Sequence, residues 1–555
     1  MGFLMIAFIL GFTGNVQGNT RFFPLEKVKP GLMGYGYTVF QGARIDKFNV
    51  KVIAVLDSGY RHDRLILVKL SGRLLEQNGG LAAGMSGSPV YFQGKLAGAV
   101  SYGFENADPY LAFITPIANM MELMKSKEAA SFQPVIDGDF PWKPVPVAVP
   151  VVVSGMGLRG YQLVKQSLQG YGLTAVYSPG PSGVNRLADG KAALKPGSAI
   201  SVQMITGDYQ IAALGTVTYI DGPRFLAFGH SFTNKGPVNY LAFNAYVFHT
   251  VRSQIMSFKL GAPIRLIGRI TEDRTAGICG RLGDGPDLIT VTVTVKDSDR
   301  NQSRFLNFSV INNEQAARDL IAAGITDAID QTIDRMGGGT AMVGFAIETG
   351  EQTLISRRNL FFGKDIAIDC LKDLKKALEL ITTNEYAAVD LKSIRIEVEV
   401  SGGQTTARIA GLKCDRTKVK PGESFLVKAQ LHTYRGIDLT IPFTVKLPQQ
   451  FPAGKLNLTV QSGSAGSAWD GESDTHKEET KTEFQNDGSL AGLLAKFSDS
   501  PKNNELVLEY YPPNSPKTEN PNHSGKDDGL KPVKQRSLTD YFIQGEARLT
   551  LDVEN

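Results

Sequence analysis

The clearest capacity for chemistry lies in the segment GMSGSP at positions 84–89, where a serine stands between glycines and a proline follows. Small neighbours leave one hydroxyl in a tight loop and let a substrate pass close to the backbone. In such a loop the N–H groups of Gly84 and Ser86 can both point at a carbonyl oxygen under attack and stabilise its developing charge. The same residues would also suit a plain turn between two strands, so the segment allows a nucleophile or a structural turn.

Two common serine motifs do not fit this segment. The nucleophile elbow G-x-S-x-G needs a glycine where Ser88 stands, and it needs a strand-to-helix turn where this chain has strands on both sides. The pattern S-x-x-K fails because Pro89 and Val90 occupy its last positions. The pattern G-x-S-G-x-P between two strands fits the loop of a trypsin-like double β-barrel.

A serine nucleophile needs a base, which is normally a histidine. His230 is the best candidate, because it follows Gly229 at the end of the apolar strand GPRFLAFGH. His249 lies in the apolar strand AYVFHTV, where a core position is expected. The remaining histidines are expected at the surface: His62 in a turn, His432 in the sandwich module, and His476 and His523 in a polar segment.

The elements that would hold these residues are mostly β-strands. Apolar and polar residues alternate in YTVFQGARIDKFNVKVIAVL, RLILVKL and SPVYFQGKLAGAVSYG, which is typical of half-buried strands joined by turns. The 59 glycines and 27 prolines also favour many short strands over long helices. Helices are predicted for 313–335 and 366–384.

The predicted fold class is mainly β with α/β insertions: a permuted trypsin-like double β-barrel followed by an Ig-like β-sandwich module. At 555 residues the chain is too long for one core. The predicted organisation is a signal peptide at 1–18, a barrel half with the serine at 19–130, a linker and α/β insertion at 131–197, a barrel half with His230 at 198–312, a mixed α/β segment at 313–394, the β-sandwich at 395–464, a polar, partly disordered region at 465–536 and a terminal strand at 537–555.

Composition excludes several classes of function. A net charge of +4 is too small for this length to indicate binding to nucleic acid or an anionic membrane surface. The three cysteines are far apart and form neither a disulfide framework nor a zinc motif. The apolar run near the N-terminus is about ten residues long, too short for a membrane helix of about 20, and small residues follow it, which indicates export.

Two long segments carry a resemblance to a known family. The chain resembles the SpoIVB peptidases, serine peptidases of the trypsin-like clan, in GMSGSPVYFQGKLAGAV around Ser86 and in GTVTYIDGPRFLAFGH around His230. The flanking run at 28–50 and RLLEQNGG before the serine agree as well. The resemblance implies that Ser86 is the nucleophile, His230 the base, and Gly84 and Ser86 the oxyanion hole.

This chain departs from the family pattern in two ways. Ser86 precedes His230 by 144 residues, whereas in the sporulation enzyme the histidine segment comes first, so the parts are expected to be circularly permuted. The position that matches the family's aspartate is Ser71. Asp273 is the first candidate for the orienting acid and Asp208 the second, and a Ser–His dyad is the third option.

The predicted function is an exported serine endopeptidase that cleaves proteins in the cell envelope, in the periplasm or outside the cell. No cofactor or metal is expected, and the expected partner is a protein or peptide substrate rather than nucleic acid. Self-cleavage follows from the resemblance, with the loop near 515–535 as an accessible site, and the C-terminal β module could bind another envelope protein. The alternative is a catalytically inactive scaffold on the same barrels, which the missing aspartate favours.

Overall fold

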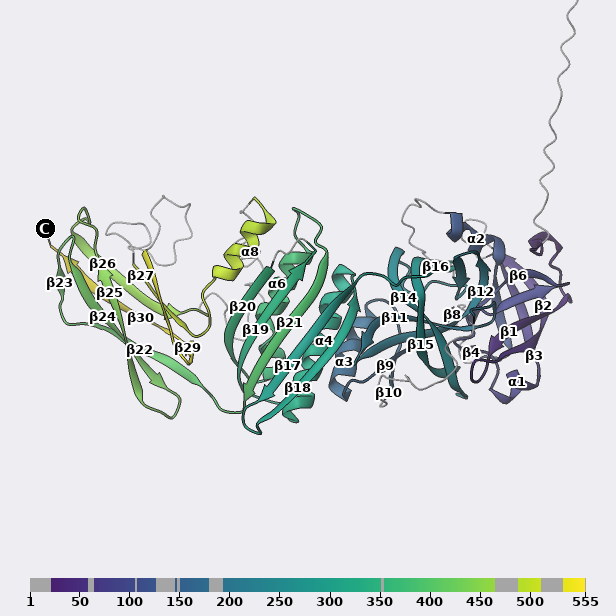
Figure 1. Cartoon of the computed structure of the whole chain (residues 1–555), viewed down its shortest axis with the longest axis horizontal. Helices are drawn as coiled ribbons and strands as arrows, with labels where there is room; N and C mark the ends of the chain where they lie inside the picture. Colours follow the sequence, from purple (N-terminus) through teal and green to yellow (C-terminus); the bar gives the residue numbers. More distant parts are fainter. Residues whose placement is uncertain are drawn as a thin grey trace, which may run out of the picture.

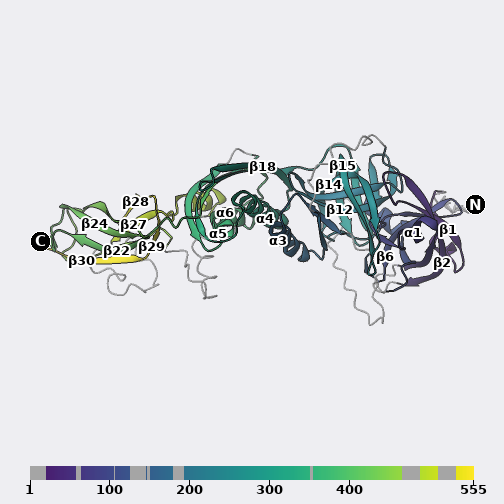
Figure 2. The same cartoon turned by 90° about the horizontal axis from the view of Figure 1, so that it is seen from below.

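The computed structural model is elongated, with β-barrels at its N-terminal end and a β-sandwich at its C-terminal end (Figures 1 and 2). Among the described residues no helix is long and apolar enough to cross a bilayer. The predicted signal peptide at 1–18 and most of the loop near 515–535 lie outside the described part of the chain, as do His62, His476 and His523. The structure describes residues 21–57, 64–104, 107–125, 145–146, 150–178, 193–350, 354–464, 488–510 and 533–554.

The first sheet closes into a barrel because its outer strands pair with each other. Alternating apolar side chains, such as those of Val50, Val52 and Val68, point inward and form a buried core. A short strand, β8 (Val145–Pro146), extends the sheet beyond the ring. The ring of six strands runs in the order β5 (Pro89–Phe92), β1 (Met33–Val39), β2 (Ile45–Asp57), β3 (Arg64–Ser71), β7 (Leu111–Pro116) and β6 (Lys95–Gly103), and β6 pairs back to β5.

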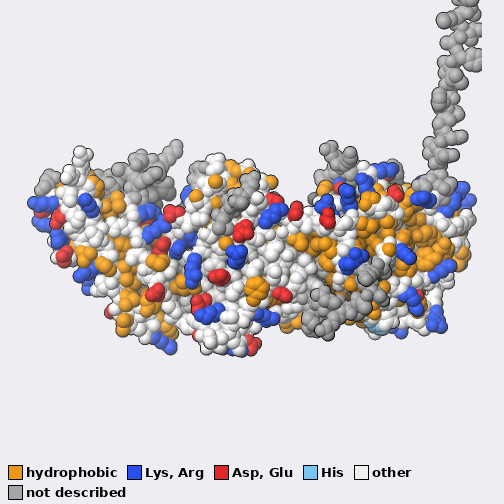
Figure 3. Space-filling view, viewed as in Figure 1, with side chains coloured by type: hydrophobic (Ala, Val, Ile, Leu, Met, Phe, Trp, Pro, Cys, Tyr) orange, Lys and Arg blue, Asp and Glu red, His pale blue; other side chains and the backbone are white. Residues whose placement is uncertain are grey.

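A second ring of six strands forms the next barrel. Its long hairpin, β14 and β15, has several register shifts, and such bulges let long strands bend around a barrel. Hydrophobic side chains gather over the barrels on the face shown in Figure 3. The ring runs in the order β12 (Gln210–Asp221), β13 (Arg224–Ala227), β16 (Gly277–Leu282), β15 (Ser257–Arg274), β14 (Gly236–Val251) and β11 (Ala199–Gly207), and β11 pairs back to β12.

One of the register shifts in β14 explains the position of His249. The expectation that this histidine lies in the core is wrong, because its side chain is exposed. The pairing of β14 with β15 shifts between Val247 and His249, so the alternation of buried and exposed positions is interrupted there. Phe248 is exposed at the same bulge.

The two barrels share elements and not only a contact surface. The strand β4 (Ala82–Ala83) leaves the first barrel and pairs in parallel with β15 of the second. Helix α2 (Ile117–Lys125) buries Met120 and Leu123 against residues of both barrels, including Leu226. The turn at Gly42 also pairs with Val247. The loop that carries Ser86 therefore starts from a strand bonded to the opposite barrel.

Beyond the second barrel, the ends of β11 and β12 continue into a sheet that is covered by helices on one face (Figure 2). Residues 151–178 and 288–401 both contribute to this sheet and share one hydrophobic core. Its further strands are β9 (Val151–Ser154), β10 (Ala175–Ser178), β17 (Leu288–Asp297), β18 (Gln302–Ile311), β19 (Gly339–Thr349), β20 (Leu354–Gly363) and β21 (Leu391–Ser401). Its helices are α3 (Leu158–Gln169), α4 (Glu314–Ile333), α5 (Ile366–Asp369) and α6 (Lys372–Thr382).

The C-terminal residues form two sheets around a separate apolar core. Helix α8 (Leu490–Asp499) comes between two sandwich strands in the sequence, but it packs against α6 and β20 of the preceding sheet. One sheet holds β25 (Asp438–Lys446), β24 (Ser424–Thr433), β22 (Thr406–Cys414) and β29 (Phe542–Gln544). The other holds β23 (Lys418–Val419), β30 (Glu546–Val553), β26 (Gly454–Ser462), β27 (Glu505–Tyr510) and β28 (Val533–Leu538).

The predicted fold class is confirmed: the chain is mainly β, with paired barrels, α/β elements and a C-terminal sandwich. The predicted helices at 313–335 and 366–384 correspond to α4 and to α5 with α6.

Arg357 is a single side chain that holds α8 in place, and its loss has a predictable cost. Its buried guanidinium donates to Asp373 at 2.5 Å and to the carbonyl oxygens of residues 497, 498, 500 and 501. We expect Arg357→Met to lower the free energy of unfolding by about 3 kcal/mol, because it removes the ion pair with Asp373 and a charged donor shared by several buried carbonyls. Urea denaturation measures this change. Arg358→Met, on the exposed face of the same strand, should cost less than about 0.5 kcal/mol. Equal costs for the two variants would contradict the role of Arg357 in holding α8.

Candidate functional site

Ser86 lies in the loop between β4 and β5, at the seam of the two barrels. The side chain is fully buried, and its Oγ makes no hydrogen bond with any described group. The backbone N–H of Met85 donates to Ala82 O and that of Gly87 to Val100 O, whereas no described loop hydrogen bond uses the N–H of Ser86. A buried hydroxyl without a partner is unusual and needs a reason. A reactive oxygen beside a spare backbone donor is one such reason.

Glycine is required on each side of the serine. Gly84 and Gly87 have φ angles of +92° and +90°, where other residues are strained. A Cβ on Gly87 would stand 2.0 Å from Thr216 O and 2.4 Å from Phe228 N, so the backbone of the serine loop touches that of the strand leading to His230.

The second barrel holds the serine loop through two threonines of β12. Thr216 N donates to Ser86 O at 2.9 Å, and Thr216 Oγ1 donates to Gly84 O at 2.9 Å. Thr218 Oγ1 donates to Gly87 O at 2.7 Å. Three positions around the hydroxyl are thus bonded to one strand of the opposite barrel, which limits how far the loop can move.

Lys259 of β15 is a further residue of this site that sequence reasoning missed. Its side chain is 1% exposed, and its Nζ donates to Gly84 O at 2.9 Å and to Thr38 Oγ1 at 2.8 Å. Burial lowers the pKa of this lysine to about 7. The available signal was a lysine in the strand SFKLGAP, but only the register of β15 shows that this position points inward.

His230 follows β13 and lies against the first barrel. It is 3% exposed, and its ring centroid lies 6.0 Å from that of Tyr102 on β6. Thr115 Oγ1 of β7 donates to Gly229 O at 2.7 Å. The backbone turns through two left-handed residues just before the histidine, Phe228 at φ +71° and Gly229 at φ +72°. A buried phenylalanine in that region costs about 1–3 kcal/mol, and such strain is typical of functional sites.

The hydrogen bond of His230 Nδ1 determines which ring nitrogen is basic. Nδ1 lies 2.7 Å from Ser231 O. A carbonyl oxygen can only accept, so Nδ1 carries the proton and the lone pair is on Nε2. This is the tautomer that a general base needs, and a backbone carbonyl holds it where a carboxylate does so in a Ser-His-Asp site.

Asp273 is buried on β15 and bonded to the loop after the histidine. Its oxygens accept from Phe232 N at 2.7 Å, Thr233 N at 2.5 Å, Thr233 Oγ1 at 2.7 Å and Asn234 N at 3.0 Å. Burial raises the pKa of this carboxyl, and these hydrogen bonds oppose the rise. Within the described part of the chain its hydrogen bonds go to residues 232–234, so Asp273 supports the loop and makes no bond to the imidazole ring.

The second candidate acid, Asp208, and the position that matches the family's aspartate, Ser71, lie elsewhere. Asp208 is exposed at the tip of the β11–β12 hairpin, where it accepts from Asn307 N at 2.7 Å. Ser71 ends β3 and is exposed. Ser86 and His230, by contrast, both belong to the seam, each within two residues of the contact between Gly87 and Phe228, although Ser86 Oγ is not bonded to the ring.

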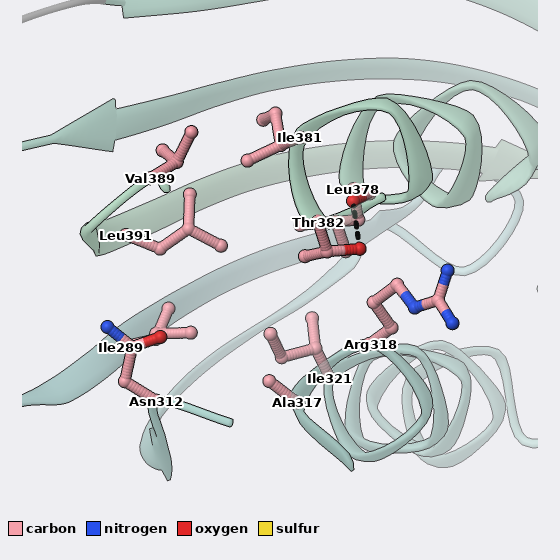
Figure 4. Close-up of a pocket in the computed structure, with 10 residues that line it drawn as sticks. All are labelled: Ile289, Asn312, Ala317, Arg318, Ile321, Leu378, Ile381, Thr382, Val389 and Leu391. Atoms are coloured by element: carbon pink, nitrogen blue, oxygen red, sulfur yellow. Dashed lines mark hydrogen bonds between the residues drawn. The ribbon is translucent and has the colours of Figure 1, made fainter. Parts of the chain in front are cut away.

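A pocket drawn in Figure 4 lies away from these residues, where α4 and α6 pack on the sheet that follows the second barrel. Apolar side chains such as Ile321, Ile381 and Leu391 line it, and its Thr382 Oγ1 donates to Leu378 O at 2.8 Å. Its lining lacks the pairing of a nucleophile with a base that catalysis would need. Across the residues that the structure describes, no three His, Cys, Asp or Glu side chains gather as a metal site would require.

Comparison with known proteins finds a family match over the part of the chain that includes the serine loop. Residues 24–121 match the family model of SpoIVB peptidase S55. This segment is therefore similar to the corresponding part of SpoIVB-type serine peptidases. The match covers less than a fifth of the chain and does not reach His230. No curated protein and no solved structure matches the chain.

Asp273 supplies a test of the loop after His230. Asn in its place would set an amide N–H₂ against backbone N–H donors, so we expect Asp273→Asn to lower the free energy of unfolding by about 3 kcal/mol. Urea denaturation measures the change. Asp284→Asn, at an exposed position after β16, is the control and should cost less than about 0.5 kcal/mol. A similar small cost at Asp273 would show that the carboxylate does not hold the loop.

Lys259 makes the stability of the protein depend on pH. Its pKa is about 7 in the folded chain, against 10.5 for a free lysine side chain. Between these values the unfolded chain binds a proton that the folded chain lacks, so this contribution to stability rises with pH and is smallest below pH 7. The difference in unfolding free energy between wild type and Lys259→Met should rise by up to about 1.4 kcal/mol per pH unit from pH 7 to 9. Urea denaturation at several pH values measures it, and a constant difference would contradict the prediction.

Proposed function

We propose that the chain is a serine endopeptidase that is exported to the cell envelope and cleaves protein substrates there. The observation that carries the proposal is the seam, where the backbone at Gly87 contacts Phe228 and a buried serine and a buried histidine come from opposite barrels. The family match over residues 24–121 supports the serine-peptidase chemistry. The apolar run before residue 20 is the basis for export.

In the proposed mechanism Ser86 Oγ attacks the peptide carbonyl while its proton passes to His230 Nε2. The N–H groups of Gly84 and Ser86 stabilise the oxyanion. As the intermediate collapses, Nε2 returns the proton to the leaving amine, and an acyl-enzyme remains on Ser86. Water then hydrolyses the acyl-enzyme with the same base.

A second candidate function is a non-catalytic scaffold in which the barrels and the C-terminal sandwich bind other envelope proteins. The observation in its favour is that Ser86 Oγ is buried and not bonded to His230. A peptidase with this arrangement has to open its seam before a substrate can reach the serine.

Labelling with a fluorophosphonate probe tests the proposal. We expect intact-mass and peptide mapping to find one adduct on Ser86 of the wild-type chain, and no adduct in Ser86→Ala or His230→Ala. Ser88→Ala is the matched control, because the Ser88 hydroxyl is also buried and has no hydrogen bond to a described group, and it should be labelled like wild type. A folded wild-type chain that takes no label would support the scaffold.

A further inference from the structure

Lys259 places a buried amino group close to the serine, and the proposed mechanism does not use it. Among the described residues its Nζ has three acceptors, namely Gly84 O at 2.9 Å, Thr38 Oγ1 at 2.8 Å and, more distantly, Thr216 Oγ1 at 3.5 Å. None of these acceptors is a carboxylate. The amino group is therefore buried against uncharged partners.

Stability alone does not explain a lysine at this position. Lysine is almost never fully buried unless it is paired with an opposite charge. Replacing buried charges by apolar side chains of similar volume is often neutral or stabilising, so a methionine would serve the core at least as well. A buried ionisable group with a strongly altered environment next to a candidate nucleophile is a pointer to function.

The three acceptors show which parts of the structure the lysine amino group connects. Thr38 is on β1 of the first barrel, Thr216 is on β12 of the second, and Gly84 belongs to the serine loop. The stem of the lysine runs under the loop, since a Cβ on Gly84 would lie 3.1 Å from Lys259 Cδ. The same strand also pairs through Ser257 and Phe258 with β4, where the loop begins.

We infer that Lys259 is a positioning residue for the oxyanion hole: its amino group donates to the carbonyl of Gly84 and thereby fixes the backbone from Gly84 to Ser86. A peptide group is planar, so holding the Gly84 oxygen sets the orientation of the whole unit between Gly84 and Met85. The loop then needs no rearrangement when charge develops on the substrate, which is the condition for strong electrostatic stabilisation. Lys259 does not touch the substrate in this role.

The inference rests on the proposed peptidase activity. Two measurements on Lys259→Met distinguish a failure of the inference from a failure of the proposed activity. Amide hydrogen exchange of residues 82–90 should become at least about 10-fold faster, because the loop loses the lysine donor that is bonded to Gly84 O. The rate of fluorophosphonate labelling should fall by about 10- to 100-fold, the effect of a misplacement of about 1 Å. Lys296→Met, which removes an exposed lysine on β17, is the matched control and should change neither readout.

Each outcome decides a different point. Unchanged exchange in folded Lys259→Met overturns the inference, and so does faster exchange with unchanged labelling of a wild type that is active. A wild type that takes no label refutes the proposed function, and exchange alone then decides whether Lys259 holds the loop. If Lys259→Met does not fold, Thr38→Val removes one acceptor of the lysine amino group, and unchanged exchange and labelling in that variant overturn the inference.

Discussion

The hydrogen bonds that join the serine loop to β12 are the constraint on which the rest of the site depends. Thr216 bonds to both Gly84 and Ser86, and Thr218 bonds to Gly87. The serine loop connects strands of the first barrel, but the second barrel determines its shape. Neither barrel contains a complete site. The closed rings of strands supply rigid walls, and the seam between them is where the chemistry is possible.

On the histidine side of the seam, the first barrel holds a loop of the second barrel. Gly229 is bonded to Thr115 of the first barrel, and the ring of His230 lies near Tyr102 of that barrel. The carboxylate of Asp273 holds the loop that follows, and the carbonyl of Ser231 orients the ring. A backbone carbonyl thus holds the ring, and a buried carboxylate holds the loop that follows it.

Local sequence was sufficient for much of the fold because alternation and turn residues act within a few positions of each other. The strands around Ser86, the helices α4 and α6 and the sandwich strands were predicted in this way. The bulge that exposes His249 was not, because a register shift depends on the partner strand. The shared sheet of residues 151–178 and 288–401 was also beyond reach, since such pairing joins segments far apart in the chain.

The sequence by itself determined that the chain is mainly β and that a glycine-flanked serine and a strand-end histidine are its candidate reactive groups. Residue type and spacing carry that information directly. Tertiary structure alone decided that both residues lie at one seam, that Asp273 bonds to a loop rather than to the imidazole, and that Lys259 points inward under the serine loop. These facts depend on closure of two rings and on the register of long strands, and no pattern within a short segment encodes either.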